Sequence, residues 1–270
     1  MGFMAAKYLF VASEIGVFEK LASGPLILDA LAAATGIPPR TLRISADAMV
    51  SLGLLERVDA RYRNSAAAAA FLAGAPGPDL RPMLRFWDKL SYPGWINLES
   101  AVRNGRGQAG FFRFNEEEQQ IFSTGVEAFS APAAAALAMG YDFGRHRRIL
   151  DVAGGTGSFL IAILRRHAAL CGTLFELAGT CAVARRRLAR EPEGARIVGA
   201  RLLLVDLWMD ASRTQPPAAP VMAGEFLIHA GDGQSYAEDE ADAWLAQTDW
   251  RKLERRPLAG PASVIIAEAA

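Results

Sequence analysis

The chain has 270 residues, of which 51% are hydrophobic and 21% charged, so it can form one large or two modest globular domains. Its 29 basic residues balance its 29 acidic ones, which excludes a global positive field for holding nucleic acid or an anionic membrane. The two cysteines, Cys171 and Cys181, are too few for a disulfide framework or a zinc site. We expect both in the core, no metal, and a reducing cytoplasm as the compartment.

Residues 1–21 predict a helix that is apolar on more than one face. Apolar residues recur at helical spacing, while Lys7 and Glu14 interrupt the run, so neither a membrane span nor a signal peptide is expected. A helix with two apolar faces needs a second partner, such as another subunit.

Residues 24–72 predict a winged helix-turn-helix. Gly36 suits a helix C-cap, and Pro38 and Pro39 suit a turn and the first position of the next helix. The predicted parts are a helix at 28–36, a turn at 37–39, a helix at 40–56 and a hairpin at 58–65.

Basic residues in this region raise the possibility of DNA binding. Arg40, Arg43 and Arg63 could contact phosphates, but acidic residues flank them. Because recognition needs a concentrated basic face, a solvated surface is the favoured interpretation.

A linker and an aromatic-rich region follow. Residues 73–80 are rich in Gly and Pro and predict a linker, and residues 81–140 have a largely helical pattern. Most of the aromatic side chains must be core, and a few could line a pocket for a flat aromatic ligand.

From residue 148 the pattern alternates between strands and helices. Strands this apolar, separated by helices, indicate a parallel sheet covered on both faces. The predicted strands are 148–153, 172–177, 201–209 and 262–269, and the first two helices are 158–170 and 179–194.

The turn after the first of these strands is rich in glycine, in the stretch DVAGGTGSFL at 151–160. A phosphate loop would need a lysine that this stretch lacks. A dinucleotide fingerprint starting from Gly155 and Gly157 would need its third glycine at Leu160. What remains is an acid at the strand end, Asp151, followed by a turn without bulky side chains.

This stretch resembles the first motif of class I S-adenosylmethionine-dependent methyltransferases, which usually reads D-V-G-G-G-T-G. The departure is Ala153, which is small enough that we expect binding to survive. The second strand ends in FELA where the family usually has F-D-L-P, and the resemblance implies that Glu176 binds the ribose. The implied cofactor-binding residues in the turn are Asp151, Ala153, Gly154, Gly155 and Gly157.

The whole chain is similar to the plant-type and bacterial small-molecule O-methyltransferases. The resemblance implies an α/β fold, with a Rossmann-like doubly wound methyltransferase sheet preceded by a mostly α winged-helix dimerisation domain. It places a homodimerisation domain that binds no DNA at 1–80, a connector lining the substrate pocket at 81–140 and the cofactor domain at 141–270. Ser130 matches a cofactor-contacting serine of the family, the alternative being a helix N-cap before Pro132. The candidate pocket residues are Trp95, Phe122, Phe129, Met139, Met222 and Phe226.

The pattern breaks where residues 195–200 run directly into the strand that begins at Arg201. Two parallel strands need a crossover between them, so roughly sixty residues of strand, helix and strand are missing by comparison with the family. Either this passage is absent from the sequence as read, which we favour, or it is a real deletion. An ordinary spacing of about 3.8 Å between neighbouring Cα atoms across 197–202 would contradict the first explanation.

The missing passage leaves no residue to match the family's histidine base. His146 and His167 are expected to be structural, and His229 is expected to be packed or exposed within a helix. The catalytic base is therefore unassigned.

The expected function is transfer of a methyl group from S-adenosylmethionine to a phenolic hydroxyl of an aromatic secondary metabolite, such as a polyketide or antibiotic intermediate. One alternative is a winged-helix regulator that senses a small molecule. Another is a relative that keeps the cofactor for a different, non-methylating role.

Overall fold

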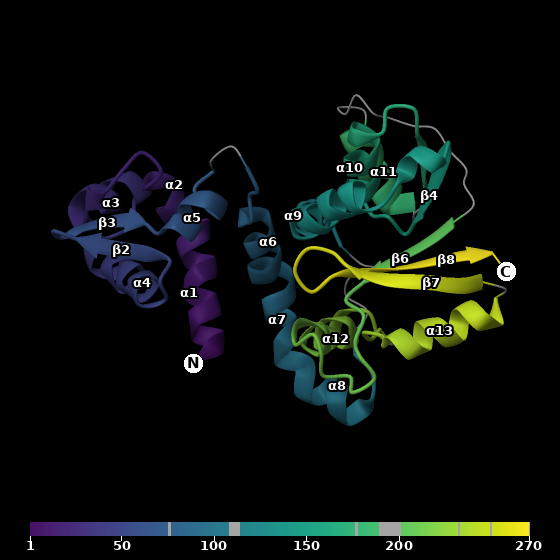
Figure 1. Ribbon diagram of the computed structural model, residues 1–270. Coiled ribbons are helices and arrows are strands. Elements are labelled where there is room, and N and C mark those ends of the chain that lie inside the picture. The colour runs from purple at the N-terminus through teal and green to yellow at the C-terminus, as the bar shows by residue number, and fades with distance from the viewer. Residues whose placement is uncertain are drawn as a thin grey trace. The chain divides into compact units, whose positions relative to one another are not determined.

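The computed structural model describes residues 1–74, 77–107, 114–175, 178–188, 201–231, 233–248 and 250–269. These residues form two compact units, both drawn in Figure 1. The first unit comprises Met1–Pro93 and Thr124–Phe129, and the second comprises Gly94–Ser123 and Ser130–Ala270. The connector predicted at 81–140 is thus shared between the two units.

The first unit begins with the predicted helices and hairpin. Gly36, with φ of 72°, ends one helix, and Pro39 occupies the first position of the next. Asp59 and Ala60, with φ of 48° and 60°, turn the hairpin in the mirror-image conformation that suits strand twist. The elements are α1 (Gly2–Glu14), α2 (Val17–Lys20), β1 (Leu26–Ile27), α3 (Leu28–Thr35), α4 (Pro39–Ser51), β2 (Leu55–Val58) and β3 (Arg61–Asn64).

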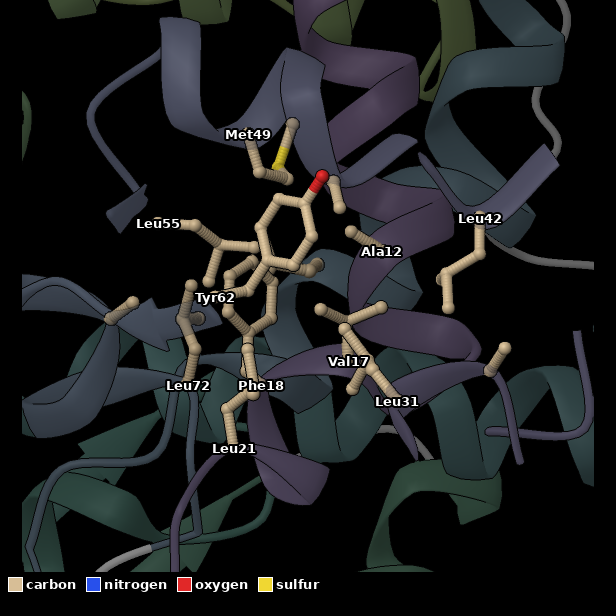
Figure 2. Close-up of a cluster of buried hydrophobic side chains, with 14 residues drawn as sticks. Ala12, Val17, Phe18, Leu21, Leu31, Leu42, Met49, Leu55, Tyr62 and Leu72 are labelled. Carbon is tan, nitrogen blue, oxygen red and sulfur yellow. The ribbon is translucent and has the colours of Figure 1, made fainter. Parts of the chain in front are cut away.

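The second predicted helix was too long. It ends at Ser51 rather than at residue 56, because Gly53 takes a left-handed conformation and Leu55 enters β2. The strands pair antiparallel in the order β1–β3–β2. Helices α1, α3 and α4 and this sheet enclose one core, whose side chains include Phe18, Met49 and Tyr62 (Figure 2).

One of the remaining helices of the first unit precedes the linker at 73–80, and two follow it. A π-helix interrupts them at Trp87–Ser91, where the buried Asp88 pairs with Lys7 and with Lys89. These helices are α5 (Ala66–Phe71), α6 (Arg81–Phe86) and α7 (Tyr92–Gly94).

The second unit contains the strands of the predicted methyltransferase domain. Its helices are a 3₁₀ turn at Trp95–Asn97, α8 (Leu98–Asn104), most of α9 (Glu116–Gly140), a 3₁₀ turn at Phe143–Arg145, α10 (Ser158–Arg166), α11 (Ala178–Leu188), α12 (Ala218–His229) and α13 (Glu238–Gln247). Its strands are β4 (Arg148–Val152), β5 (Cys171–Phe175), β6 (Arg201–Asp206), β7 (Trp250–Pro257) and β8 (Ser263–Ala269).

Helix α9 contributes residues to both units. An Asn115–Glu118 capping box starts it, and the helix continues through Pro132 to Gly140. By length and apolar composition alone it could also cross a membrane. Its first turn holds three glutamates, however, and Leu137 and Ala138 near its end are buried in the core. These features favour a core helix of a folded unit.

Strand β8 is the centre of one sheet, in the order β6–β8–β7 with antiparallel pairing on both sides. Val264 and Ile266 pack with α9 and α10, while Ile265 and Ala267 pack with α13 on the opposite face. Figure 1 shows α13 alongside this sheet. Burial on both faces explains why the strand is continuously apolar.

Strands β4 and β5 form a separate parallel pair. Gly172 allows α10 to lie against β5, since a Cβ there would come within 2.7 Å of the Leu160 side chain. Ile149 faces the core, but Leu150 and Val152 are 55% and 62% exposed. Among the described residues, one face of β4 is uncovered, and the strands form one parallel pair and one antiparallel sheet. The prediction of a parallel sheet covered on both faces was therefore wrong for these residues.

Candidate cofactor site

The glycine loop, residues 153–157, connects β4 to α10. Every second residue of the loop has a positive φ, namely 56° at Ala153, 59° at Gly155 and 88° at Gly157. Left-handed φ at alternate positions can point backbone N–H groups into a shared concavity, which suits a polar ligand. Glycine is usual at this position in the family, and the left-handed φ of Ala153 is a conformation that strains a residue with a side chain.

Asp151 lies directly against this loop. A Cβ added to Gly154 would lie 2.3 Å from the Cγ and Oδ2 atoms of Asp151, so only glycine fits beneath the carboxylate. At Gly155 an added Cβ would meet no described atom within 4 Å, so the described residues leave this side of the loop open. The residues present therefore fit a ligand that approaches the backbone and carries a group complementary to a carboxylate.

Arg187 reaches the same loop from the last turn of α11. Its Nη1 atom donates hydrogen bonds to the Thr156 hydroxyl at 2.8 Å and to the Ser158 hydroxyl at 2.9 Å. The sequence alone does not single out this residue, because Arg187 lies in a run of three arginines in which nothing distinguishes one from another.

Glu176 and Ser130 are the two other predicted cofactor contacts. Glu176 lies outside the described residues. The predicted break near 199–201 falls at the end of residues 189–200, which also lie outside them. Ser130 is half-buried in the interior of α9, so the alternative interpretation as an N-cap is wrong. Its predicted contact with the cofactor stays a prediction.

One predicted pocket residue packs on α12, the helix that carries two others. Trp95 packs on this helix at Gly224, where a Cβ would come within 2.9 Å of the indole, and its Nε1 donates to Glu225 Oε2 at 2.9 Å. The same helix carries Met222 and Phe226. Figure 1 shows α12 beside α8, which follows Trp95 in the chain.

Glu225 is a buried charged residue that the sequence analysis missed. It is only 2% exposed, and its Oε1 lies 3.7 Å from Nε2 of His229, one turn along the same helix. A lone acid within the apolar stretch APVMAGEFLIH is the signal that would have identified it. His229 is packed, as one of the two predicted outcomes had it.

The remaining predicted pocket residues lie elsewhere on α9. Phe122 packs against Phe114 with ring centroids 5.4 Å apart. Phe129 and Met139 are 44% and 64% exposed. Nothing in these positions brings them together with Trp95, and their role in a pocket stays a prediction.

The other two histidines have structural partners, as expected. His146 stacks on Tyr141 and hydrogen-bonds with its hydroxyl at 2.8 Å. His167 donates through Nε2 to the Ala138 carbonyl at 3.2 Å. Cys171 is a free thiol of intermediate burial rather than a fully buried core residue.

Two family models match the chain. Residues 1–74 match an O-methyltransferase dimerisation domain, and residues 95–203 match an O-methyltransferase domain, which includes the glycine loop. The family inferred from the loop is thereby confirmed.

Bacterial relatives support the same conclusion. The chain is 36% identical over 206 residues to 3-hydroxy-5-methyl-1-naphthoate 3-O-methyltransferase of Streptomyces sahachiroi, covering 73% of this chain and 59% of that one. It is 33% identical over 184 residues to the tetracenomycin polyketide synthesis 8-O-methyl transferase TcmO of Streptomyces glaucescens, covering 66% and 54%. The chain thus spans somewhat more than half the length of these curated relatives.

The predicted fold class is confirmed by a solved structure. Human N-acetylserotonin methyltransferase in complex with SAM superposes with a TM-score of 0.89 at 20% identity, over 99% of this chain and 94% of that one. At this identity the likeness concerns the fold alone. From the two matching domains and their order, the chain belongs to the O-methyltransferase family.

Proposed function

We propose that this protein transfers a methyl group from S-adenosylmethionine to a phenolic hydroxyl of an aromatic secondary metabolite, such as a polyketide or antibiotic intermediate. The observation that carries the proposal is the glycine loop, which places Asp151 and an open, left-handed backbone turn at the end of β4 in a chain of the O-methyltransferase family. The related naphthoate and tetracenomycin enzymes support the class of acceptor.

The residues that would hold the cofactor are Asp151 and the backbone of the glycine loop, with Glu176 and Ser130 as the further predicted contacts. The Asp151 carboxylate suits the amine of the cofactor's amino-acid end, while the turn accepts the chain beside it without a side chain intervening. When bound, S-adenosylmethionine supplies an electrophilic methyl group on a sulfonium.

The acceptor must be held with its oxygen in line with that methyl group, which is mainly a matter of positioning. We assign this task to Trp95, Met222 and Phe226 around α12, with Phe122, Phe129 and Met139 as further candidates. A phenol has a pKa of about 10 and must lose its proton to react, usually to a base. No residue is assigned as that base, because each histidine of the chain is engaged in the packing described above.

The same proposal includes a cytoplasmic homodimer formed through the N-terminal domain. Helix α1 exposes large apolar side chains outside the core of the first unit, namely Phe3, Met4, Tyr8 and Val11. The match of residues 1–74 to a dimerisation domain supports a second subunit as their partner. We propose no nucleic-acid or membrane partner, since the charges of the chain balance.

One observation favours a second candidate, a cofactor-binding protein that does not methylate. Among the described residues, β4 pairs only with β5 and leaves Leu150 and Val152 exposed. This fits the loss of a strand and its covering helices, as does the share of its relatives' length that the chain spans. The missing passage would carry the adenine-binding acid and the histidine base of the family. A chain that truly lacks it has no residue to match that base and should catalyse little methyl transfer.

A methyl-transfer assay separates these candidates. The protein is incubated with methyl-labelled S-adenosylmethionine and a panel of hydroxylated naphthoates and other polycyclic phenols, and labelled product is measured. Labelled ether with at least one acceptor is expected. Binding of the cofactor without product from any acceptor would support the non-methylating candidate, and salt-dependent, sequence-selective DNA binding would support the regulator.

A further inference from the structure

The last turn of α11 brings a positive charge to the glycine loop. The half-buried Arg187 joins Thr156 and Ser158 through hydrogen bonds of 2.8 Å and 2.9 Å from one nitrogen. These two hydroxyls flank Gly157, the residue that precedes α10. Because Thr156 is only 5% exposed, the guanidinium is fixed to an ordered part of the loop rather than to a mobile surface.

The loop is therefore bordered by two opposite charges. The Asp151 carboxylate lies over Gly154 and the Arg187 guanidinium lies against Thr156 and Ser158, and these contacts fall within a few residues of one turn. A cation beside the start of a helix opposes the helix dipole, so the arrangement becomes favourable when an anionic group of a ligand binds next to it.

We propose that Arg187 binds the carboxylate of the cofactor's amino-acid end. This inference rests on the proposed function, since the ligand is the same S-adenosylmethionine. The amino-acid end of the cofactor is a zwitterion, and Asp151 and Arg187 supply the two complementary charges. Guanidinium–carboxylate pairs are among the stronger hydrogen-bonded pairs in proteins. A planar guanidinium can donate two parallel hydrogen bonds to a carboxylate, which the ammonium group of a lysine does not do.

Isothermal titration with two ligands tests this assignment. The ligands are S-adenosylhomocysteine and its decarboxylated analogue, which keeps the amine and lacks only the carboxylate. In Arg187→Gln we expect the dissociation constant for S-adenosylhomocysteine to rise about 10- to 100-fold, with the analogue bound within about twofold of wild type. Arg186→Gln is the matched control, because it removes the same charge from an exposed neighbour and should change neither constant.

The alternatives give different results. An equal loss for both ligands in Arg187→Gln would mean that the arginine only positions the loop, and no loss would mean that it does not face the ligand; either result overturns the inference alone. Absence of S-adenosylhomocysteine binding by the folded wild type would instead refute the proposed function. If Arg187→Gln fails to fold, Arg187→Lys is the second variant, because it keeps the positive charge without the planar guanidinium. It should show a smaller loss of affinity, confined to S-adenosylhomocysteine.

Discussion

Replacing Gly154 by alanine should weaken cofactor binding through a displacement of Asp151. The added Cβ would lie 2.3 Å from Cγ of Asp151, so the carboxylate must rotate away from the loop. A hydrogen bond to a charged group contributes about 1.5–3 kcal/mol, and about 1.4 kcal/mol corresponds to a tenfold change in affinity. The dissociation constant for S-adenosylhomocysteine should therefore rise about 10- to 150-fold.

Isothermal titration measures this change, and urea unfolding shows whether the variant remains folded. Gly140→Ala is the matched control, because Gly140 belongs to the same unit and a Cβ added there meets nothing within 4 Å. The control should bind as wild type does. If Gly154→Ala also bound within about twofold of wild type, the Asp151 carboxylate would not be part of the cofactor site.

Three further changes test other parts of the account. Ala153→Gly removes the strain of a left-handed alanine and should raise the free energy of unfolding by up to about 1 kcal/mol in urea titrations, after the larger chain entropy of glycine is subtracted; a loss of stability would contradict the strain. Trp95→Phe leaves the buried Glu225 carboxylate without the indole donor and should lower the free energy of unfolding by about 1–3 kcal/mol, so an unchanged urea midpoint would show that the hydrogen bond contributes nothing. Burial raises the pKa of Asp206, so the folded state disfavours its charged form; this contribution is most favourable in acid and is lost as the pH rises through the raised pKa. Asp206→Asn should accordingly have a higher melting temperature than wild type at neutral pH, and the difference should vanish in acid. Thermal unfolding from acidic to neutral pH measures this difference, and a difference that stayed constant or grew in acid would contradict burial as the cause.

The loop and its strand could be predicted because each leaves a local signature. A short apolar run ending in an acid and followed by glycines specifies a strand, a turn and a helix without reference to the rest of the chain. The φ of 56° at Ala153 could not be predicted in this way, because its side chain gives no sign that the backbone is left-handed. That conformation depends on how β4 and α10 are joined in space.

Other features depend on contacts between distant segments. Strand β4 is apolar enough to be buried on both faces, as the side chains of Leu150 and Val152 illustrate. Only the structure shows that no described residue covers the face on which these two side chains lie. Pro132 favours a helix break, yet α9 continues through it, since tertiary packing of its last turns offsets the lost hydrogen bond. The contact of Trp95 with Glu225 joins residues 130 positions apart, which no local pattern encodes.

The most direct test of the account is a crystal structure of the intact protein grown with S-adenosylhomocysteine. We expect density for the ligand across the loop of residues 153–157, with its amine near Asp151 and its carboxylate near Arg187. Well-ordered protein whose loop carries no ligand at saturating concentration, or ligand bound only at another surface, would contradict the central claim that this turn is the cofactor site.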